Sequence, residues 1–352
     1  QRYLIIGTGS VGIKLAECLL ERGERLVRGF DAVPPAKPPP GLKFVQGSVC
    51  DLEALKMAMA GVDVVFTTVA IIRYFERLEW QYPASHAVNV SGTENIIAAC
   101  RACSVQTLIQ TSSSNVCVSR ELASLDMDEN SPTVTKRNSP NHYGWTKAQA
   151  ERLVVEANGI TLGADGQKCL RTGVIRPCSA IFGPYDNFIT QRYLREGTVT
   201  IFLPEPVIDY VFVENVVWGH LLLEARLHDR PAEVAGNVFC ISNEEPRHTS
   251  QEFYDAVAYF YEKRFGRSLG FSYLPPRLML LIAHIVEGIQ RITHRRLHGD
   301  IALLTPAMFD LASLSYAFSS AKAGKLLGYK PLYNLDQAIQ KTIQLWDEAG
   351  KP

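Results

Sequence analysis

Residues 3–20 read YLIIGTGSVGIKLAECLL, and this segment gives the clearest indication of how the chain folds. An apolar, β-branched run at residues 3–6 indicates a strand, and the apolar spacing at residues 13–21 is typical of a helix. A GxGxxG turn lies between them. Glycines let the backbone turn tightly and approach a ligand closely, and the amino end of a helix attracts negative charge. The segment therefore predicts a pyrophosphate-binding turn whose contacts would come from Gly7, Gly9, Ser10, Val11 and Gly12.

A second strand is predicted at residues 26–30, and it is followed by Asp31, about 20 residues beyond the glycine turn. A carboxylate at this point can accept hydrogen bonds from both hydroxyls of a ribose, and it would repel a 2′-phosphate. We therefore expect NAD(H) rather than NADP(H) as the cofactor. The alternative is a tight turn followed by an exposed aspartate, with no ligand.

Strand and helix patterns alternate along more than half of the chain. Further strands are predicted at residues 44–45, 62–69, 106–110, 171–175 and 237–241, and further helices at 52–60, 90–103, 141–157, 214–226, 250–264 and 334–348. This alternation predicts an α/β fold: a Rossmann-type, doubly wound parallel sheet with helices on both faces.

The length of 352 residues favours about two domains. The pattern loosens after residue 182, so we expect a smaller substrate-binding cap that is interleaved with the sheet. The dinucleotide-binding domain would cover residues 1–182, with residues 208–242 returning to it. The cap would take residues 183–207 and 243–333, and residues 334–352 would form a C-terminal helix.

The composition excludes several classes of protein. Lys and Arg number 36, Asp and Glu also number 36, and the formal net charge is zero, so no nucleic-acid partner is expected. The eight cysteines and eight histidines show no metal-ligand spacing, which favours free thiols in a reducing compartment and no metal. No secretory signal is visible, and we expect a cytoplasmic protein.

Residues 143–147, YGWTK, place a tyrosine and a lysine four positions apart on a predicted helix. Such positions share a helix face, so the phenol of Tyr143 and the ammonium of Lys147 would lie side by side. A nearby cation lowers the pKa of a phenol, which suits an acid or base that interconverts an alcohol and a ketone. Upstream, TSSSNV at residues 111–116 follows a strand and offers hydroxyls for a substrate oxygen. The alternatives are a solvated helix face and an ordinary polar turn.

Together these segments resemble an extended short-chain dehydrogenase/reductase, and within that superfamily the 3β-hydroxysteroid dehydrogenase family, which includes the sterol-4α-carboxylate 3-dehydrogenases. Matching segments run along nearly the whole chain. They are the glycine turn, GFD at 29–31, NVSGTENII at 89–97, TSSSNV at 111–116, HYGWTK at 142–147, IRPCSAIFGP at 175–184, DYVFVENVVWGH at 209–220, FCISNEEP at 239–246 and AKAGKLLGYKP at 321–331. The turn departs from the usual TGxxGxxG spacing but keeps the last two glycines.

The resemblance implies catalytic roles at the positions that match family motifs. Tyr143 would be the general base for oxidation, and Lys147 would lower its pKa and bind the nicotinamide ribose. Ser113 would orient the substrate oxygen, because it lies three residues before Val116 as the family's serine does. Asn89 would support the helix that carries Tyr143 or take part in a proton relay.

The resemblance also implies further cofactor contacts. Arg176 and Pro177 would lie under the nicotinamide. The usual Gly-Asp after the third strand is replaced by Gly47 and Ser48, so the later Asp51 becomes the candidate contact for the adenine side.

Residues 274–292, LPPRLMLLIAHIVEGIQRI, form a mostly apolar segment that contains charged and polar residues. The first interpretation is a buried helix of the cap. The second is a helix that lies on a membrane surface, which a sterol substrate would favour. A true membrane span is the least favoured, because it needs about 20 predominantly apolar residues.

We therefore expect NAD-dependent oxidation of a 3β-hydroxysteroid or sterol to the 3-ketone. A nucleotide-sugar epimerase or dehydratase, or a flavonol-type reductase, is the alternative within the superfamily, and a non-enzymatic NAD(H)-binding sensor or scaffold is the alternative outside it. Superfamily members often dimerise through helices such as 90–103 and 141–157, so a homodimer is expected. Peripheral contact with the cytosolic face of the endoplasmic reticulum membrane is the alternative to a freely cytoplasmic protein.

Overall fold

A computed structural model describes residues 1–163, 166–186, 189–201, 203–243 and 246–348. The expected dinucleotide-binding range, both cap ranges and the end of the expected C-terminal helix each contain residues outside this description. These are residues 164–165, 187–188, 202, 244–245 and 349–352. Residues 244–245 also belong to the family-like segment at 239–246.

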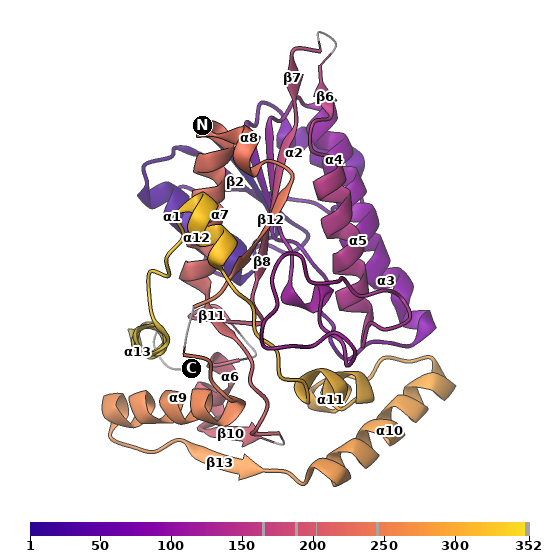
Figure 1. Ribbon diagram of the computed structural model, residues 1–352, viewed down its shortest axis with the longest axis vertical. Helices are drawn as coiled ribbons and strands as arrows, with labels where there is room; N and C mark the ends of the chain where they lie inside the picture. The colour runs from indigo at the N-terminus through magenta and orange to yellow at the C-terminus, as the bar shows by residue number, and fades with distance from the viewer. Residues whose placement is uncertain (164–165, 187–188, 202, 244–245, 349–352) are drawn as a thin grey trace.

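Seven parallel strands form the central sheet, in the order β12-β8-β5-β4-β1-β2-β3 (Figure 1). They are β1 (Arg2–Ile6), β2 (Leu26–Asp31), β3 (Lys43–Gln46), β4 (Val64–Thr67), β5 (Thr107–Thr111), β8 (Arg171–Pro177) and β12 (Asn237–Ile241). The strand order reverses beside β1, which has β2 on one side and β4 on the other. Dinucleotides bind at the carboxyl ends of the strands at such a reversal. The predicted Rossmann-type sheet is confirmed.

Helices cover both faces of the sheet (Figure 1). One face carries α1 (Ser10–Glu21) and α7 (Val213–Asp229), and α12 (Ala321–Leu327) packs against α7 and β12. The other face carries α2 (Leu52–Met59), α4 (Gly92–Ala102) and α5 (His142–Glu156), with the short α3 (Tyr82–His86) beside α5. Each face has its own apolar core, and β4 is buried along its whole length, as expected for a strand covered on both sides.

The cap lies beyond the carboxyl ends of the strands (Figure 1). It contains α6 (Gln191–Glu196), β10 (Thr198–Ile201), α9 (Ser250–Phe265), β13 (Gly270–Tyr273), α10 (Pro276–Thr293) and α11 (Pro306–Ala312). The pairing of β10 with β13 brings two distant segments side by side. A second short parallel pair, β9 (Ala180–Phe182) and β11 (Tyr210–Phe212), lies between the sheet and the cap (Figure 1). The remaining elements are β6 (Thr161–Leu162), β7 (Lys168–Cys169), α8 (Pro231–Val234) and α13 (Leu335–Glu348), which packs against α9 and β11.

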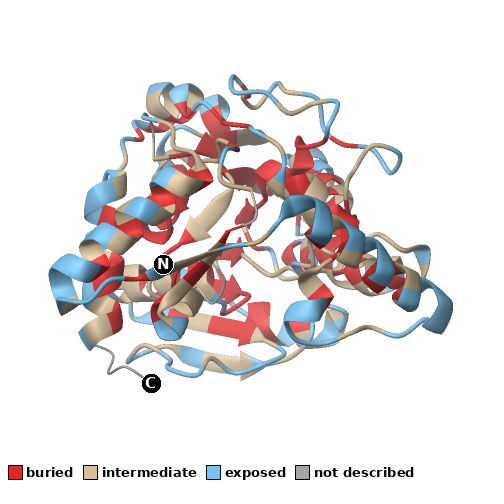
Figure 2. Ribbon diagram, turned by 90° about the horizontal axis from the view of Figure 1, so that it is seen from below, coloured by how far each residue is buried: buried red, intermediate tan, exposed pale blue. Residues whose placement is uncertain are grey.

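The segment predicted at residues 274–292 is helix α10, and it is not simply the buried cap helix of the first interpretation. Its buried residues are Met279, Ala283, Val286, Glu287 and Gln290. Five large apolar residues are exposed instead, at spacings of three and four that place them on one outer face: Leu278, Leu281, Ile285, Ile289 and Ile292. Figure 2, seen from the cap side, shows exposed ribbon along the cap helices and buried strands behind them. Among the described residues, no helix is long and apolar enough to cross a membrane.

Two predicted elements differ at their ends in a way that bears on the site. The strand predicted at residues 62–69 is shorter at both ends, and just beyond it Oγ1 of Thr68 donates to the carbonyl oxygen of Gly7 at 2.8 Å. The helix predicted at residues 90–103 is preceded by a turn of π-helix, Ala87–Ser91, which runs directly into α4. Turns of this kind are common at functional sites, and this one carries Asn89.

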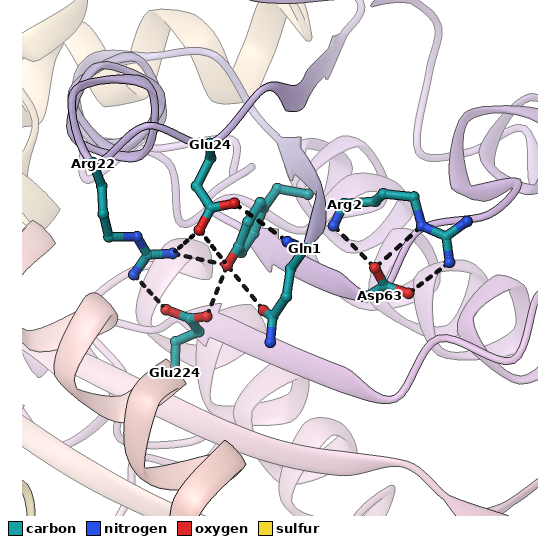
Figure 3. Close-up of polar contacts among 7 residues, drawn as sticks. Gln1, Arg2, Arg22, Glu24, Asp63 and Glu224 are labelled. Carbon is teal, nitrogen blue, oxygen red and sulfur yellow. Dashed lines mark hydrogen bonds and ion pairs between the residues drawn. The ribbon is translucent and has the colours of Figure 1, made fainter.

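Ion pairs hold the amino end of the sheet together (Figure 3). The hydroxyl of Tyr3 on β1 accepts a hydrogen bond from Arg22 at 2.8 Å and donates to Glu224 of α7 at 3.0 Å. Arg22 also pairs with Glu224 at 2.8 Å and with Glu24 at 3.2 Å. This cluster fixes α7 against β1 at the end of the sheet opposite the cap.

Candidate active site

The glycine turn has the close contacts that a dinucleotide site requires. Gly7 has a φ of +94°, which side chains rarely adopt, and a Cβ on it would lie 2.6 Å from the backbone nitrogen of Val69. A Cβ on Gly12 would lie 1.9 Å from the carbonyl oxygen of Gly7. Gly9 differs, because a Cβ there would meet nothing within 4 Å. Gly7 and Gly12 therefore allow the turn itself, whereas Gly9 leaves open space beside it.

The first turn of α1 supplies the amide groups. Helix α1 begins at Ser10, continues through Val11, and is preceded by Gly9, which offers no side-chain cap for the helix. The first N–H groups of a helix have no partner within the helix, and they carry partial positive charge. They are the groups that a pyrophosphate would engage.

Asp31 lies at the end of β2 and touches the glycine turn. Its Oδ2 accepts a hydrogen bond from the backbone nitrogen of Thr8 at 2.7 Å, and its Oδ1 accepts one from the backbone nitrogen of Val33 at 3.3 Å. The carboxylate is therefore oriented by the turn that would hold the pyrophosphate, and it is partly exposed.

Asp51 has a structural partner of its own. It is the N-cap of α2, and its Oδ1 accepts hydrogen bonds from the backbone nitrogens of Glu53 and Ala54, both at 3.0 Å. Capping accounts for an aspartate at this position without a ligand. Its proposed adenine contact stays a prediction.

Ser113 and Tyr143 meet at the carboxyl end of the sheet. Ser113 follows β5, and its Oγ accepts hydrogen bonds from the backbone nitrogen and Nδ2 of Asn115, both at 3.2 Å. Tyr143 lies in the first turn of α5, which is capped by the side chain of Asn141. The two residues are 7% and 4% exposed, and Ser113 lies close enough to Tyr143 to lower the pKa of its phenol.

The ionisation of Tyr143 is governed by opposing effects. Burial raises the pKa of Tyr143 to about 12, and hydrogen bonds with Ser113 and Tyr74 act in the opposite direction. The phenol is therefore protonated at neutral pH in this conformation. The ring of Tyr74 stands edge-on to that of Tyr143, with centroids 5.0 Å apart and an interplanar angle of 83°.

Lys147 lies one helical turn beyond Tyr143 and is 3% exposed. Its Nζ donates to the carbonyl oxygen of Thr111 at 2.7 Å. Burial lowers the pKa of Lys147 to about 8, and the charge of Glu151 only partly opposes this. The hydroxyl of Thr111 donates to Nε2 of His220 at 2.7 Å, because Nδ1 of that histidine faces the carbonyl oxygen of Val216.

Asn89 connects α5 to the loop that follows β4. Its Nδ2 donates to Oγ1 of Thr146 on α5 at 3.0 Å and to the carbonyl oxygen of Ile71 at 3.2 Å. Its Oδ1 accepts from the backbone nitrogen of Ile71 at 2.8 Å. The amide therefore contacts the helix that carries Tyr143, as a supporting role would require.

Arg176 and Pro177 end strand β8. The guanidinium of Arg176 is buried and pairs with Glu151 of α5 at 2.6 Å, with a further donor to the carbonyl oxygen of Asp128 at 3.4 Å. These partners engage a guanidinium that the family resemblance places near the nicotinamide. Contact of this strand end with the cofactor stays a prediction.

Tyr74 is the residue that the sequence analysis missed. Its segment follows β4, and in a parallel sheet the segments that follow each strand converge at one edge. That rule was a usable signal, but it does not say which side chain of a loop turns inward.

The residues fit NAD. The open space at Gly9, the amino end of α1 and the oriented carboxylate of Asp31 would hold the pyrophosphate and a ribose, with Lys147 and Tyr143 on the nicotinamide side. Among the residues that the structure describes, no three His, Cys, Asp or Glu side chains gather as a metal-binding group. All eight cysteines are free thiols.

Fold and site together define an NAD-dependent short-chain dehydrogenase/reductase of the extended type. The sequence model of the 3-beta hydroxysteroid dehydrogenase/isomerase family matches residues 4–272, and the chain belongs to that family.

Named relatives agree with this assignment. The mouse sterol-4-alpha-carboxylate 3-dehydrogenase, decarboxylating, is 31% identical over 367 residues, covering 99% of this chain and 91% of the relative. The zebrafish (Danio rerio) short-chain dehydrogenase/reductase family 42E member 1 is 31% identical over 350 residues, covering 96% and 87%. The Arabidopsis thaliana 3beta-hydroxysteroid-dehydrogenase/decarboxylase isoform 1 is 31% identical over 315 residues, covering 86% and 66%.

Solved structures share the fold. MoeE5 in complex with UDP-glucuronic acid and NAD superposes with a TM-score of 0.73 at 20% identity, over 99% of this chain and 100% of that one. The UDP-glucose 4-epimerase of Thermotoga maritima gives 0.73 at 18% identity, over 99% of both chains. At these identities the likeness concerns the fold alone.

Proposed function

We propose that this protein oxidises the 3β-hydroxyl of a steroid or sterol to the 3-ketone with NAD. The observation that carries the proposal is the meeting of Ser113, Tyr143 and Lys147 at the carboxyl edge of the sheet, the edge at which the glycine turn also lies. The substrate class is supported by family membership and by the names of the relatives, two of which are sterol or hydroxysteroid dehydrogenases.

The chemistry assigns one task to each side chain. When bound, NAD supplies the acceptor for the hydride that leaves the substrate carbon. Tyr143 takes the hydroxyl proton at its Oη, and Ser113 donates a hydrogen bond to the substrate oxygen. Lys147 supplies the positive charge that favours the phenolate of Tyr143. Asn89 holds the helix that carries both residues.

A substrate panel tests the reaction. The purified protein is mixed with NAD and either 3β-hydroxysteroids or UDP-sugars, and the absorbance of NADH is followed. We expect NADH to form with at least one 3β-hydroxysteroid or sterol. Turnover of UDP-sugars alone would replace the proposal with the sugar-nucleotide alternative, and no turnover of any alcohol despite NAD binding would favour a sensor or scaffold.

We also propose that the outer face of α10 rests on a membrane surface, with the cytosolic face of the endoplasmic reticulum as the expected place. The exposed residues Leu278, Leu281, Ile285, Ile289 and Ile292 support this contact. Exposed basic side chains flank them, including Arg277, Arg291 and Arg295. An apolar stripe bordered by arginines is typical of a helix that lies in the interface of an anionic bilayer.

Vesicle flotation tests the membrane contact. We expect the protein to float with anionic phospholipid vesicles, and Ile285→Glu to abolish this. Met57→Glu is the matched control, because Met57 is 72% exposed on α2, away from the cap. Equal flotation of both variants would contradict the assignment to α10.

A homodimer is proposed through α4 and α5, which lie side by side on one face of the sheet (Figure 1). Light scattering of the purified protein measures its mass in solution. A monomer at all concentrations would contradict this.

A further inference from the structure

Tyr74 lies in the loop after β4, and this loop is linked to α5 through Asn89 before Tyr74 and directly after it. Before Tyr74, the backbone of Ile71 is bonded to Asn89 through both its nitrogen and its carbonyl oxygen, at 2.8 and 3.2 Å. After Tyr74, the carbonyl oxygen of Glu76 accepts from the backbone nitrogen of His142 at 2.9 Å. The loop is therefore linked on both sides of Tyr74 to the helix that carries Tyr143.

The cap holds the same loop from the other side. The carboxylate of Glu76 is fully buried and pairs with Arg296, beyond α10, at 2.7 Å and with Arg73 at 3.2 Å. The next residue, Arg77, pairs with Glu287 of α10 at 2.7 Å. Buried ion pairs with good geometry fix orientation even where they add little stability. Tyr74 is thus held between the sheet and the cap.

The two phenols face each other directly. Their rings are edge-on with centroids 5.0 Å apart and an interplanar angle of 83°, and each phenol affects the pKa of the other. The other titratable group that acts on Tyr74 is Tyr316, which follows α11 and whose hydroxyl is bonded to Ser179 at 3.0 Å. Lys147 lies one turn along α5 and is bonded to Thr111.

We propose that Tyr74 is a positioning residue for the oxidation, whose hydroxyl donates a hydrogen bond to Oη of Tyr143 and favours the phenolate that takes the substrate proton. The proposal rests on the proposed function. Tyr74 keeps its own proton throughout, and the proton from the substrate hydroxyl ends on Tyr143. A donor to Oη stabilises the phenolate, so a bond in this direction would lower the pKa of Tyr143 and raise that of Tyr74.

The first test compares Tyr74→Phe with the wild type across pH. Oxidation needs the phenolate, so kcat/KM rises with pH through the pKa of Tyr143. Losing a donor to the phenolate should shift this rising limb of the pH profile upwards by about one pH unit. At a pH below the limb, oxidation should then be about tenfold slower. The rate above the limb should be recovered, and in the reverse reduction the active range should extend to higher pH. Tyr82→Phe is the control, because Tyr82 follows the same loop and packs against His142.

The second test needs no turnover. In protein labelled with carbon-13 at the tyrosine ring carbon that bears the hydroxyl, the resonance of Tyr143 is assigned by its loss in Tyr143→Phe. At neutral pH we expect it to move in Tyr74→Phe and to stay in place in Tyr82→Phe.

The results of these tests distinguish the role of Tyr74 from the proposed oxidation itself. An unmoved resonance, or turnover with an unmoved pH limb, would overturn the role of Tyr74 and leave the proposed function standing. A rise in KM alone would also overturn it, and would make Tyr74 a substrate contact. No turnover by the wild type would overturn the proposed function, and with it any effect of Tyr74 on the rate.

Discussion

The two ends of the central sheet differ in how they treat buried charge and polarity. At the amino end, Arg22 lies between Glu24 and Glu224, and the phenol of Tyr3 is bonded to the same groups (Figure 3). At the carboxyl end, Lys147 is bonded to a neutral carbonyl oxygen, and the nearby carboxylate of Glu151 is taken by Arg176.

Polar atoms without partners add to the difference. Among the described residues, the hydroxyl of Ser112, Oδ1 of Asn115 and Nδ2 of Asn141 are buried near the carboxyl edge with no hydrogen-bond partner, whereas the amino end has Oγ1 of Thr172. Buried groups of this kind cost stability unless something binds them. One end of the sheet is therefore arranged for stability, and the other keeps polar groups available for a ligand and a reaction.

The largest effect is expected from Lys147→Met. Oxidation should fall by about a hundredfold or more, because the phenolate of Tyr143 loses its cation. The folded protein should nevertheless become more stable at pH 7, since the pKa of Lys147 is lowered to about 8 and the unfolded chain binds that proton more tightly. We expect a gain of about 2 kcal/mol, after the lost bond to Thr111 is allowed for.

The size of this gain depends on pH. Between about pH 8 and the ordinary lysine pKa, the folded state has lost the proton that the unfolded state still binds, so the stability of the wild type rises with pH. The advantage of Lys147→Met in denaturant melts should therefore shrink over that range. If Lys147→Met were less stable than the wild type at pH 7, burial of the charged Lys147 would not destabilise the fold as claimed.

The next effect concerns the glycine turn. Comparing Gly12→Ala with Gly9→Ala separates its role in folding from its role in binding NAD. Gly12→Ala should lose about 3 kcal/mol of folding free energy, because its Cβ would overlap the carbonyl oxygen of Gly7. Gly9→Ala should melt like the wild type, since its φ of −74° and open surroundings suit alanine. It should bind NAD about tenfold more weakly by fluorescence titration. Normal NAD affinity in Gly9→Ala would place the pyrophosphate elsewhere.

A smaller effect is expected at the amino end, from Glu224→Gln. Both Arg22 and Tyr3 would lose a charged acceptor that is 6% exposed, which should cost about 2 kcal/mol in thermal or denaturant melts and leave kcat unchanged. Asp63→Asn is the control, because its pair with Arg2 is exposed and should have much less effect. If Glu224→Gln reduced turnover instead, the assignment of stability to the amino end of the sheet and of the reaction to its carboxyl end would be wrong.

The smallest effect should follow Asp31→Asn. Removing the negative charge should narrow the preference for NAD over NADP by about tenfold. Competitive binding of the two cofactors measures it. A wild-type protein that prefers NADP would contradict the argument from Asp31.

The features set by local pattern could be predicted from the sequence, and those set by distant contacts could not. The sheet, the glycine turn and the helix that carries Tyr143 and Lys147 follow from apolar periodicity and glycine spacing. The outward face of α10 depends on what packs beneath it, so its apolar pattern alone favoured burial. Tyr74 was missed because the position of its loop depends on bonds to Asn89 and, through Glu76, to Arg296, which lies 220 residues further along the chain.

The most direct test of the catalytic assignment is the variant Tyr143→Phe, measured for turnover and for NAD binding in the same preparation. We expect oxidation of a 3β-hydroxysteroid to be lost while NAD binds with wild-type affinity, because the glycine turn and Asp31 are untouched. Oxidation at the wild-type rate in Tyr143→Phe would contradict this assignment.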